Sequence, residues 1–300
     1  MKDIFKLDTV SDYNNLVGVE TLHPMVSVID LSKTKASQRD HTHLNFGVYA
    51  VFLKESDCGE LRYGRSSYDY QEGTLVFIAP GQIVQITRKA PDEQRKGWVL
   101  LFHPDLIHGT ALGRSMNDYT FFSYESNEAL HVSDRERKIV MECFSKISFE
   151  TEQHIDKHSK KLIVSNIQLF LDYCIRFYDR QFLLRENVNK GIIEKFEGVV
   201  DEYFKSDQPK SIGLPSVSFV AGKLNLSANY FGDLVKRETG KSAMEYIHLK
   251  LIHVAKEKIF DPSKSISEIS FELGFKYPQH FSRMFKNHVG VSPNDYRLQN

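Results

Sequence analysis

Hydrophobic residues in the first 125 positions occur in short runs rich in Val, Ile, Phe and Tyr, a composition typical of β-strands. Turn signals such as Glu72-Gly73 and Pro80-Gly81 separate the runs. Their even spacing predicts a small β-barrel or sandwich. The expected strands are Met25–Leu31, Phe46–Lys54, Thr74–Ala79, Ile83–Arg88 and Trp98–Phe102.

The pattern changes at Ser133, where Ser133 and Glu136 have the spacing of a capping box that starts a helix. Hydrophobic residues then recur at steps of three and four, and they form a second and longer stripe from Ile163 to Tyr178. Such a helix either packs on its own barrel or pairs with a second copy of the chain. The sequence leaves both readings open, and we treat residues 126–185 as a helical linker, with residues 156–179 as the candidate homodimer interface.

A further helix is expected over residues 188–204, followed by a polar segment, residues 205–213, with the Pro, Gly and Ser content of a loop. Everything after this segment has helical periodicity. The predicted class is therefore α+β: a β domain over residues 1–125, the helical segment, and an all-helical domain over residues 186–300.

The helical domain contains an internal repeat, because residues 216–246 resemble residues 265–296. Matching positions are 49 residues apart up to Leu224 and 50 apart from Phe231 onward, so one extra residue falls where a turn is expected. The matched pairs are Ser216/Ser265, Val217/Ile266, Val220/Ile269, Leu224/Leu273, Phe231/Phe281, Leu234/Met284, Lys236/Lys286, Gly240/Gly290, Ser242/Ser292 and Tyr246/Tyr296.

Each copy has the pattern of a short helix, a tight turn and a second helix. In the second copy Ser265 and Glu268 form a capping box, Gly274 suits the turn, and Pro278 suits the first position of the next helix. That helix is expected to bury Phe281 and leave a polar face outward. This is the plan of a helix-turn-helix, and we place the two units at residues 216–238 and 265–288.

Between the units, Ser242 and Glu245 open a helix that is expected to run to Phe260. At 1.5 Å per residue, about 17 residues span roughly 25 Å. A rod of this length is compatible with two recognition helices one DNA turn, about 34 Å, apart.

Composition and charge narrow the class of protein. A hydrophobic fraction of 41% and a charged fraction of 26% are ordinary for a globular protein. We expect neither a membrane span nor a signal peptide, and the scattered Cys58, Cys143 and Cys174 fit a reducing cytoplasm. The net charge is zero, but residues 214–300 hold 12 Lys and Arg against 8 Asp and Glu. This modest basic excess supports nucleic-acid binding.

The second unit also resembles a known signature. Ser265-Ile266-Ser267-Glu268-Ile269-Ser270, Leu273-Gly274-Phe275, Phe281-Ser282-Arg283-Met284-Phe285-Lys286, Gly290-Val291-Ser292-Pro293 and Tyr296-Arg297 look like that of the AraC/XylS family of bacterial regulators. The resemblance covers Val188–Asn300 and, more loosely through Gly73 and Pro80-Gly81, a cupin-like sensor domain. It implies a cytoplasmic activator or repressor that binds double-stranded DNA. Members are often homodimers and often answer a small-molecule effector; an activator would also engage RNA polymerase.

Outward positions near the start of each second helix are those that reach base edges. The hydrogen-bonding groups of Gln match those of adenine, and those of Arg match guanine. Asp233 departs from the basic or amide residue expected at its position. It either accepts a hydrogen bond from the N4 amino group of cytosine or repels the phosphate backbone of DNA. The candidate base contacts are Asn229, Gly232, Asp233, Gln279, Ser282 and Arg283. The candidate phosphate contacts are Ser227, Lys236, His280, Lys286 and Arg297.

Two other classes of protein compete with a DNA-binding regulator: a metal-dependent enzyme and a protein that binds only other proteins. His41-Thr42-His43 is the H-x-H pair of metal-binding cupins, but Gly47 stands where the carboxylate ligand is sought, and no His follows Pro80-Gly81. We therefore expect no metal, no cofactor and no enzyme, and keep His41 and His43 as candidate effector-binding residues. A protein that uses the helices only to bind another protein would not need two matching polar faces.

Overall fold

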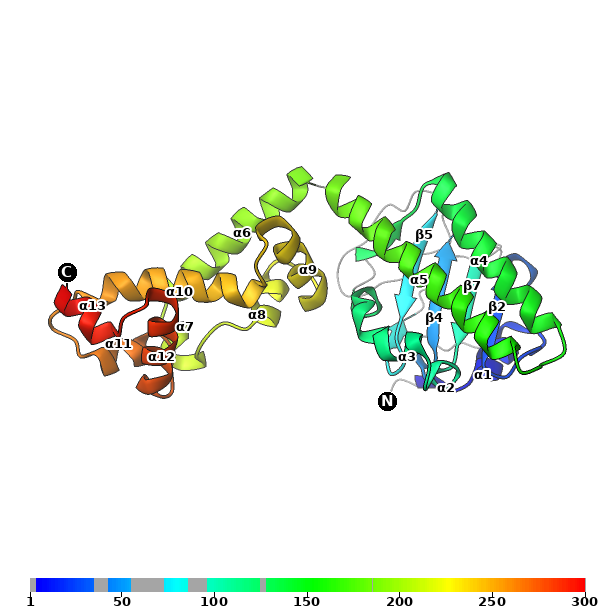
Figure 1. Cartoon of the computed structure of the whole chain (residues 1–300), viewed down its shortest axis with the longest axis horizontal. Helices are drawn as coiled ribbons and strands as arrows, with labels where there is room; N and C mark the ends of the chain where they lie inside the picture. The colour runs from blue at the N-terminus through cyan, green and yellow to red at the C-terminus, as the bar shows by residue number, and fades with distance from the viewer. Residues whose placement is uncertain are drawn as a thin grey trace. The chain divides into compact units, whose positions relative to one another are not determined.

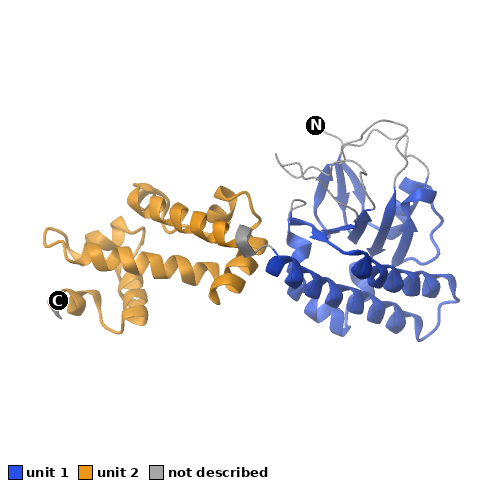
Figure 2. Cartoon of the chain, turned by 90° about the horizontal axis from the view of Figure 1, so that it is seen from above, with its two compact units in different colours: residues 1–184 blue, residues 185–300 orange. Residues whose placement is uncertain are grey.

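The structure is a computed structural model that describes residues 4–34, 43–54, 73–85, 96–124, 128–184 and 186–299. The chain divides into two compact units, unit 1 over Met1–Leu184 and unit 2 over Arg185–Asn300 (Figure 2). Unit 1 combines strands with helices, whereas the described part of unit 2 is entirely helical, as predicted (Figure 1). None of the helices that the structure describes is long and apolar enough to cross a membrane.

The described strands of unit 1 form two sheets. The smaller sheet has the order β1 (Ile4–Leu7), β3 (His43–Phe46) and β6 (Ile83–Gln85). The larger sheet has the order β2 (Val26–Asp30), β7 (Gly97–Phe102), β4 (Tyr49–Lys54), β5 (Thr74–Ile78) and β8 (Leu130–His131). Short helices α1 (Val10–Val17), α2 (Pro104–Ile107) and α3 (Ala111–Ser115) and the 3₁₀ turns η1 (Leu31–Lys33), η2 (Met116–Asp118) and η3 (Thr120–Ser123) connect them.

The larger sheet is buried on both faces. One face shares a hydrophobic cluster with the smaller sheet, in which Ala50, Ile78 and Val99 pack against Leu44 and Phe46. Helices α4 (Asp134–Glu152) and α5 (Ser159–Leu184) lie over the other face (Figure 1). Coverage on both faces explains why β5 and β7 are almost continuous hydrophobic runs in the sequence. The capping box at the start of α4, Ser133 with Glu136, is present as predicted.

The described strands form two sheets and not the closed barrel that the sequence predicted. At one edge of the larger sheet, a side chain of α5 takes the place of a further strand. Beside β8 no further described strand pairs; instead Gln181 accepts from the backbone N–H of His131 at 2.8 Å and donates to the carbonyl of Ala129 at 3.2 Å. Arg180 donates to the carbonyl of His131 at 2.6 Å and pairs with Glu136 at 2.8 Å. Side chains of a helix thus satisfy the free edge of β8 in place of another strand.

We expect Gln181→Ala to destabilise unit 1, because the Gln181 side chain is 4% exposed and its loss leaves a partly buried N–H and a buried carbonyl without that partner. The cost should be about 1–3 kcal/mol. Trp98 is the only tryptophan of the chain and lies in β7, so its fluorescence during urea unfolding reports on unit 1. The exposed Gln153→Ala is the matched control, and equal midpoints for the two variants would contradict the edge-capping role.

Unit 2 contains eight helices within its described residues. They are α6 (Glu186–Lys205), α7 (Gln208–Ile212), α8 (Val217–Lys223), α9 (Ala228–Thr239), α10 (Ala243–Ile259), α11 (Ile266–Glu272), α12 (Pro278–Val289) and α13 (Pro293–Gln299). The prediction of a loop over residues 205–213 was wrong in part, because this segment contains α7. Pro209 lies in the first turn of that helix, where a missing N–H costs nothing, and it is buried against the rest of the unit.

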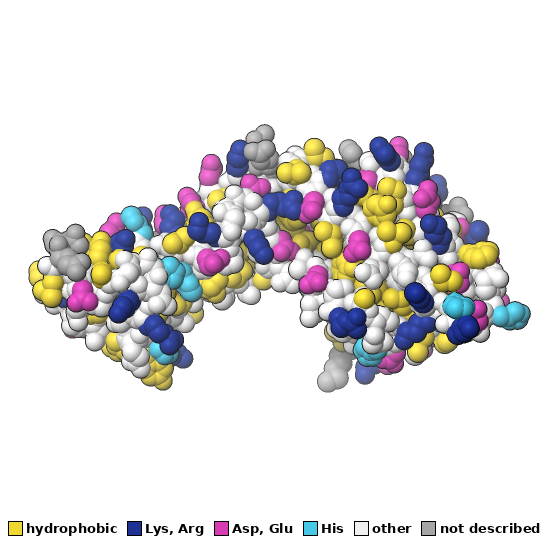
Figure 3. All heavy atoms as spheres, in the orientation of Figure 1, with side chains coloured by type: hydrophobic (Ala, Val, Ile, Leu, Met, Phe, Trp, Pro, Cys, Tyr) yellow, Lys and Arg dark blue, Asp and Glu magenta, His cyan; other side chains and the backbone are white. Residues whose placement is uncertain are grey.

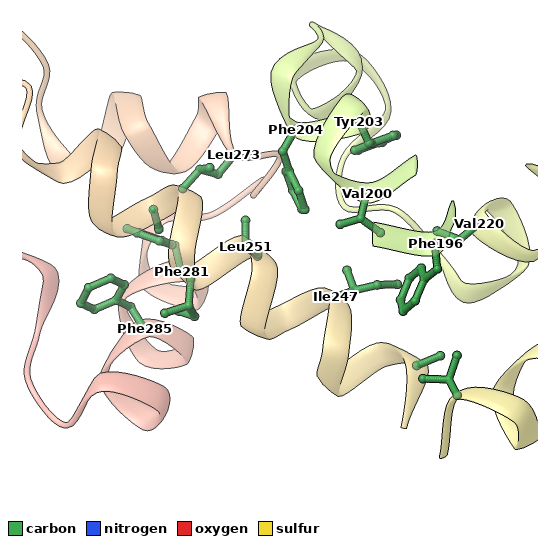
Figure 4. Close-up of a cluster of buried hydrophobic side chains, with 14 of the residues drawn as sticks. Phe196, Val200, Tyr203, Phe204, Val220, Ile247, Leu251, Leu273, Phe281 and Phe285 are labelled. Carbon is green, nitrogen blue, oxygen red and sulfur yellow. The ribbon is translucent and has the colours of Figure 1, made fainter. Parts of the chain in front are cut away.

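One hydrophobic cluster holds unit 2 together. Phe196, Val200 and Phe204 of α6 extend toward Ile247 and Leu251 of α10, and Phe281 and Phe285 of α12 pack at the other end (Figure 4). Tyr203 of α6 packs against Phe219 of α8. Helix α10 packs against α9, α11 and α12, so it connects the two repeated helix pairs. The buried side chains of α10, with Ile247, Leu251 and Ala255 among them, belong to this cluster.

Candidate nucleic-acid interface

The two repeated helix pairs have the same backbone hydrogen bonds at the predicted offset. In the turn after α8, Leu226 N–H donates to Ala221 carbonyl at 3.0 Å; after α11, Phe275 N–H donates to Ser270 carbonyl at 3.0 Å. Leu224 to Val220 and Leu273 to Ile269 form a second equivalent pair, at 3.2 and 2.9 Å. The internal repeat read from the sequence is therefore a structural repeat.

The left-handed turn residue and the extra residue also lie where the repeat predicts them. Asn225, with φ 57°, occupies the place that Gly274, with φ 94°, takes in the second pair. Asn is one of the few non-glycine residues that tolerates this conformation. The second turn is one residue longer, because α9 begins at Ala228 after its N-cap Ser227, whereas α12 begins at Pro278 after its N-cap Tyr277. Both pairs are helix-turn-helix units.

Helix α12 brings most of the predicted residues of the second unit onto one surface. Phe281 and Phe285 are fully buried, and this fixes the rotation of the helix about its axis (Figure 4). Of the predicted residues, Gln279, His280, Arg283 and Lys286 are exposed and Ser282 is half-buried. Lys, Arg and His side chains gather at the end of unit 2 where α12 lies (Figure 3).

Helix α9 carries the predicted residues of the first unit, with a different chemistry. Phe231 and Leu234 are buried, Asn229 and Lys236 are exposed, and Gly232 and Asp233 are half-buried. The Ser227 Oγ accepts from the N–H of Tyr230 at 3.2 Å, so this hydroxyl caps the helix. The face of α9 thus combines an amide, a carboxylate and a lysine, where α12 combines an amide, a hydroxyl, an arginine and a lysine.

Arg297 has a structural role that the sequence did not predict. From α13 its Nε donates to the carbonyl of Ile259 at 2.6 Å, and Nη2 donates to the carbonyl of Lys264 at 3.0 Å and lies 3.5 Å from that of Asp261. These acceptors lie at the C-terminal end of α10 and in the loop after it, where carbonyls lack helical partners. Arg297 therefore fastens this loop, and its contact with a DNA phosphate stays a prediction.

Ion pairs hold α11 against the end of α10. Glu272 lies 3.1 Å from Lys258 Nζ and 2.7 Å from Lys264 Nζ. The hydrogen bond from Lys264 contributes most to lowering the pKa of Glu272, and the reciprocal bond raises the pKa of Lys264. At the other end of α10, Tyr246 donates to Glu197 of α6, and burial together with this bond raises the pKa of Tyr246 to about 12. The second helix-turn-helix unit is thus fixed to the end of α10, and α10 is fixed to α6.

A histidine pair lies where α10 meets the end of α12. The rings of His248 and His288 are 6.1 Å apart between centroids and nearly perpendicular. Burial lowers the pKa of His248, the nearby His288 lowers it further, and Glu245 of the same helix acts in the opposite direction. The His248 side chain therefore binds a proton more readily in the unfolded chain than in the folded one. The neutral, buried His248 contributes fully to the stability of unit 2 above the unfolded-state pKa of about 6.5. This contribution is lost as pH falls toward the folded-state pKa.

We therefore expect unit 2 to lose stability as pH falls through about 6.5, and His248→Gln to reduce that loss. Urea unfolding followed by far-UV circular dichroism at several pH values measures it, with Trp98 fluorescence separating out unit 1. His253→Gln, at an exposed position on the same helix, is the control and should retain the wild-type pH dependence. An unchanged pH dependence in His248→Gln would contradict the assignment.

The structure does not bring the remaining predicted residues to this interface. His43 lies in β3 of unit 1, and His41 lies outside the described residues. Among the described residues, no group of three His, Cys, Asp or Glu side chains is placed to hold a metal ion. Two exposed residues before α12, Lys276 and Tyr277, were not predicted as contacts, because they belong to the turn rather than to the helical repeat.

Comparison with known proteins gives the family. Residues 220–299 match a family model described as a helix-turn-helix domain. The lactose operon transcription activator of Staphylococcus xylosus is 32% identical over 240 residues, which covers 80% of this chain and 80% of that protein. The Msm operon regulatory protein of Streptococcus mutans is 37% identical over 83 residues, 28% of this chain and 30% of that protein. The C-terminal domain of AraT, a response regulator from Geobacillus stearothermophilus, is 27% identical, covering 36% of this chain and 85% of that chain with a TM-score of 0.32.

The matches differ in how much of each relative they include. The matched part spans 10% of one curated relative, 25% of a second and 30% of the Msm operon regulatory protein, so this chain covers less than a third of each. The match to the lactose operon activator, at 240 residues, is longer than unit 2 and extends into unit 1. With a helix-turn-helix family match and a relative similar across both units, this chain belongs to the AraC/XylS family of transcription regulators.

Proposed function

We propose that this protein is a transcription regulator that binds double-stranded DNA in a sequence-specific manner. The observation that carries the proposal is the face of α12, the second helix of a helix-turn-helix. Burial of Phe281 and Phe285 turns Gln279 and Arg283 outward, one helical turn apart. Such a helix fits the major groove with the residues of its first turns against base edges.

The side chains on α12 match bases by their hydrogen-bonding groups. Gln279 pairs with an adenine and Arg283 with the O6 and N7 acceptors of a guanine, while Ser282, half-buried between them, reaches either a base or the sugar. On α9, Asn229 and Asp233 read an adenine and the amino group of a cytosine, and Gly232 lets the backbone approach. We propose α12 as the main reader, because the negatively charged Asp233 of α9 repels the DNA phosphates, whereas α12 carries no carboxylate.

Cations on the same surfaces position the protein on the phosphates. We propose Lys236, His280 and Lys286 for this role. Ser227, at the start of α9, is proposed to contact a further phosphate. Helix α10, with 17 residues, spans about 25 Å and connects the two units. Its length supports binding of both units in successive major grooves.

Loss of one phosphate contact should weaken every sequence alike. We expect Lys286→Ala to reduce the slope of log K against log [salt] by about 1, because one fewer counterion is released on binding. Fluorescence anisotropy with a labelled duplex at several salt concentrations measures it. Lys138→Ala, an exposed lysine of unit 1, is the control, and equal slopes for the two variants would contradict this role for Lys286.

The same salt-titrated assay on the full chain tests the proposed function. A regulator should bind duplex DNA with a strongly salt-dependent affinity and should discriminate between sequences at fixed salt. Binding that is absent, or equal for all duplexes, would favour the rival in which these helices bind only another protein.

We further propose that the chain is a homodimer through α5. Leu162, Leu169 and Leu183 are 45%, 42% and 70% exposed and lie at multiples of seven residues along this helix. That spacing places them on one line, as in a coiled-coil seam. Sedimentation of the full chain should give a dimer, and replacing Leu162 and Leu169 by Gln should give a monomer; a monomeric wild type would contradict the proposal.

We propose that the protein acts in the cytoplasm as an activator that engages RNA polymerase. We also propose that unit 1 binds a small-molecule effector of the saccharide class. The name of the lactose operon activator, whose match extends into unit 1, supports this effector class. His43 and His41 remain its candidate ligand residues. Trp98 fluorescence titrated with a panel of mono- and disaccharides tests it, and no response to any of them would count against a saccharide effector.

A further inference from the structure

Tyr277 is a large aromatic side chain exposed at the start of the second recognition helix. It is the N-cap of α12, and 56% of it is exposed. Pro278 disfavours the helical conformation for the residue before it, and Tyr277 is indeed extended, with φ −134° and ψ 119°. Its side chain makes no capping hydrogen bond, whereas the N-cap serines of α8, α9 and α11 do. The sequence has thus placed an aromatic ring where the repeat elsewhere has a capping hydroxyl.

The ring of Tyr277 lies on the outward side of α12. Its centroid is 5.5 Å from that of His280, with the rings at 64°. His280 is exposed and next in sequence to Gln279, whereas the inward side of the helix start is occupied by Phe275 and Phe281, which pack together at 5.4 Å. The contact with His280 restrains the ring, so less side-chain entropy is lost when it meets a partner.

We infer that Tyr277 contacts the C5-methyl group of a thymine next to the base pair that Gln279 reads. This inference rests on the proposed function and specifies one further base for the same helix. The thymine methyl is the apolar group on the major-groove edge, and apolar side chains recognise it by contact. Gln279 and Arg283 supply hydrogen bonds on this face, and Tyr277 supplies an apolar surface at its start. The pair of Tyr277 and His280 therefore adds a preference for thymine over cytosine.

The test replaces the methyl group on the DNA and the ring on the protein. Sites are first selected from a random duplex library with the full wild-type chain, and each thymine of the selected site is then replaced singly by deoxyuridine. Wild type should lose affinity about fourfold at one thymine, the factor expected for one buried methyl group. Tyr277→Ala should bind the methylated site more weakly and lose the sensitivity to deoxyuridine at that thymine.

Two further variants make the result specific. Tyr277→Phe retains the ring and should retain the deoxyuridine effect; if it loses as much as Tyr277→Ala, the hydroxyl is responsible and the inference is overturned. Leu298→Ala removes an exposed apolar side chain from α13 and should leave the deoxyuridine scan unchanged. If Tyr277→Ala loses as much affinity as wild type at every deoxyuridine replacement, the inference is also overturned. If wild type selects no site at all, the proposed function fails; if it selects a site that Arg283→Ala alters and Tyr277→Ala does not, only this inference fails.

Discussion

Gly274→Ala should destabilise unit 2 by about 2–4 kcal/mol, the largest effect that an added methyl group should have at any glycine of this unit. Gly274 has φ 94°, and a Cβ at this position would lie 2.8 Å from the carbonyl carbon of Gly213 and 3.0 Å from the carbonyl oxygens of Gly213 and Pro209. All three are backbone atoms, which cannot rotate away. The turn before α12 packs directly on the segment after α7, so its strain would reach the recognition helix.

Gly290→Ala is the matched control, because Gly290 has nearly the same φ, 92°, but open space around its Cβ position. It should show only the conformational cost, about 1–2 kcal/mol. Urea unfolding by far-UV circular dichroism measures both variants, and the Trp98 fluorescence transition of unit 1 should not move. If Gly274→Ala lowered the free energy of unfolding by no more than Gly290→Ala, the close approach of Gly274 to the backbone of Gly213 and Pro209 would be contradicted.

Arg283→Ala should have the largest effect on DNA recognition. The variant should lose about 1–3 kcal/mol of discrimination at one base pair, which is the contribution of a bidentate arginine–guanine contact. Lys286→Ala, three residues along the same helix, should by contrast weaken binding to all sequences equally. Competition binding with a library degenerate at single positions of the selected site separates the two behaviours. An unchanged base preference in Arg283→Ala would contradict its assignment to a guanine.

Sequence reasoning succeeded where the information is local. The capping boxes of Ser133 with Glu136, Ser242 with Glu245 and Ser265 with Glu268 all form, because each depends on two residues within one helical turn. The repeat and its extra turn residue could be read for the same reason. The outward face of α12 followed from the position of Phe281 and Phe285 on a helix with 3.6 residues per turn.

The features that the sequence did not predict depend on contacts between distant residues. Gln181 satisfies the edge of β8 across about 50 positions of the chain, and nothing in its neighbourhood marks it. Arg297 matched the expectation for a phosphate contact by type, but the carbonyls that it binds belong to residues 33–38 positions earlier. Tyr277 lay in the turn, outside the helical pattern that directed attention to Gln279 and Arg283.

In the proposed function, unit 2 presents two unequal recognition helices to DNA, and α12 is the main reader. In vitro selection of duplexes bound by the full chain tests it most directly. We expect enriched sites with two elements about one helical turn, or 10 base pairs, apart. The more strongly specified element should contain the guanine whose preference is lost in Arg283→Ala. A selected pool with no sequence preference, or a preference that α12 substitutions leave unchanged, would contradict it.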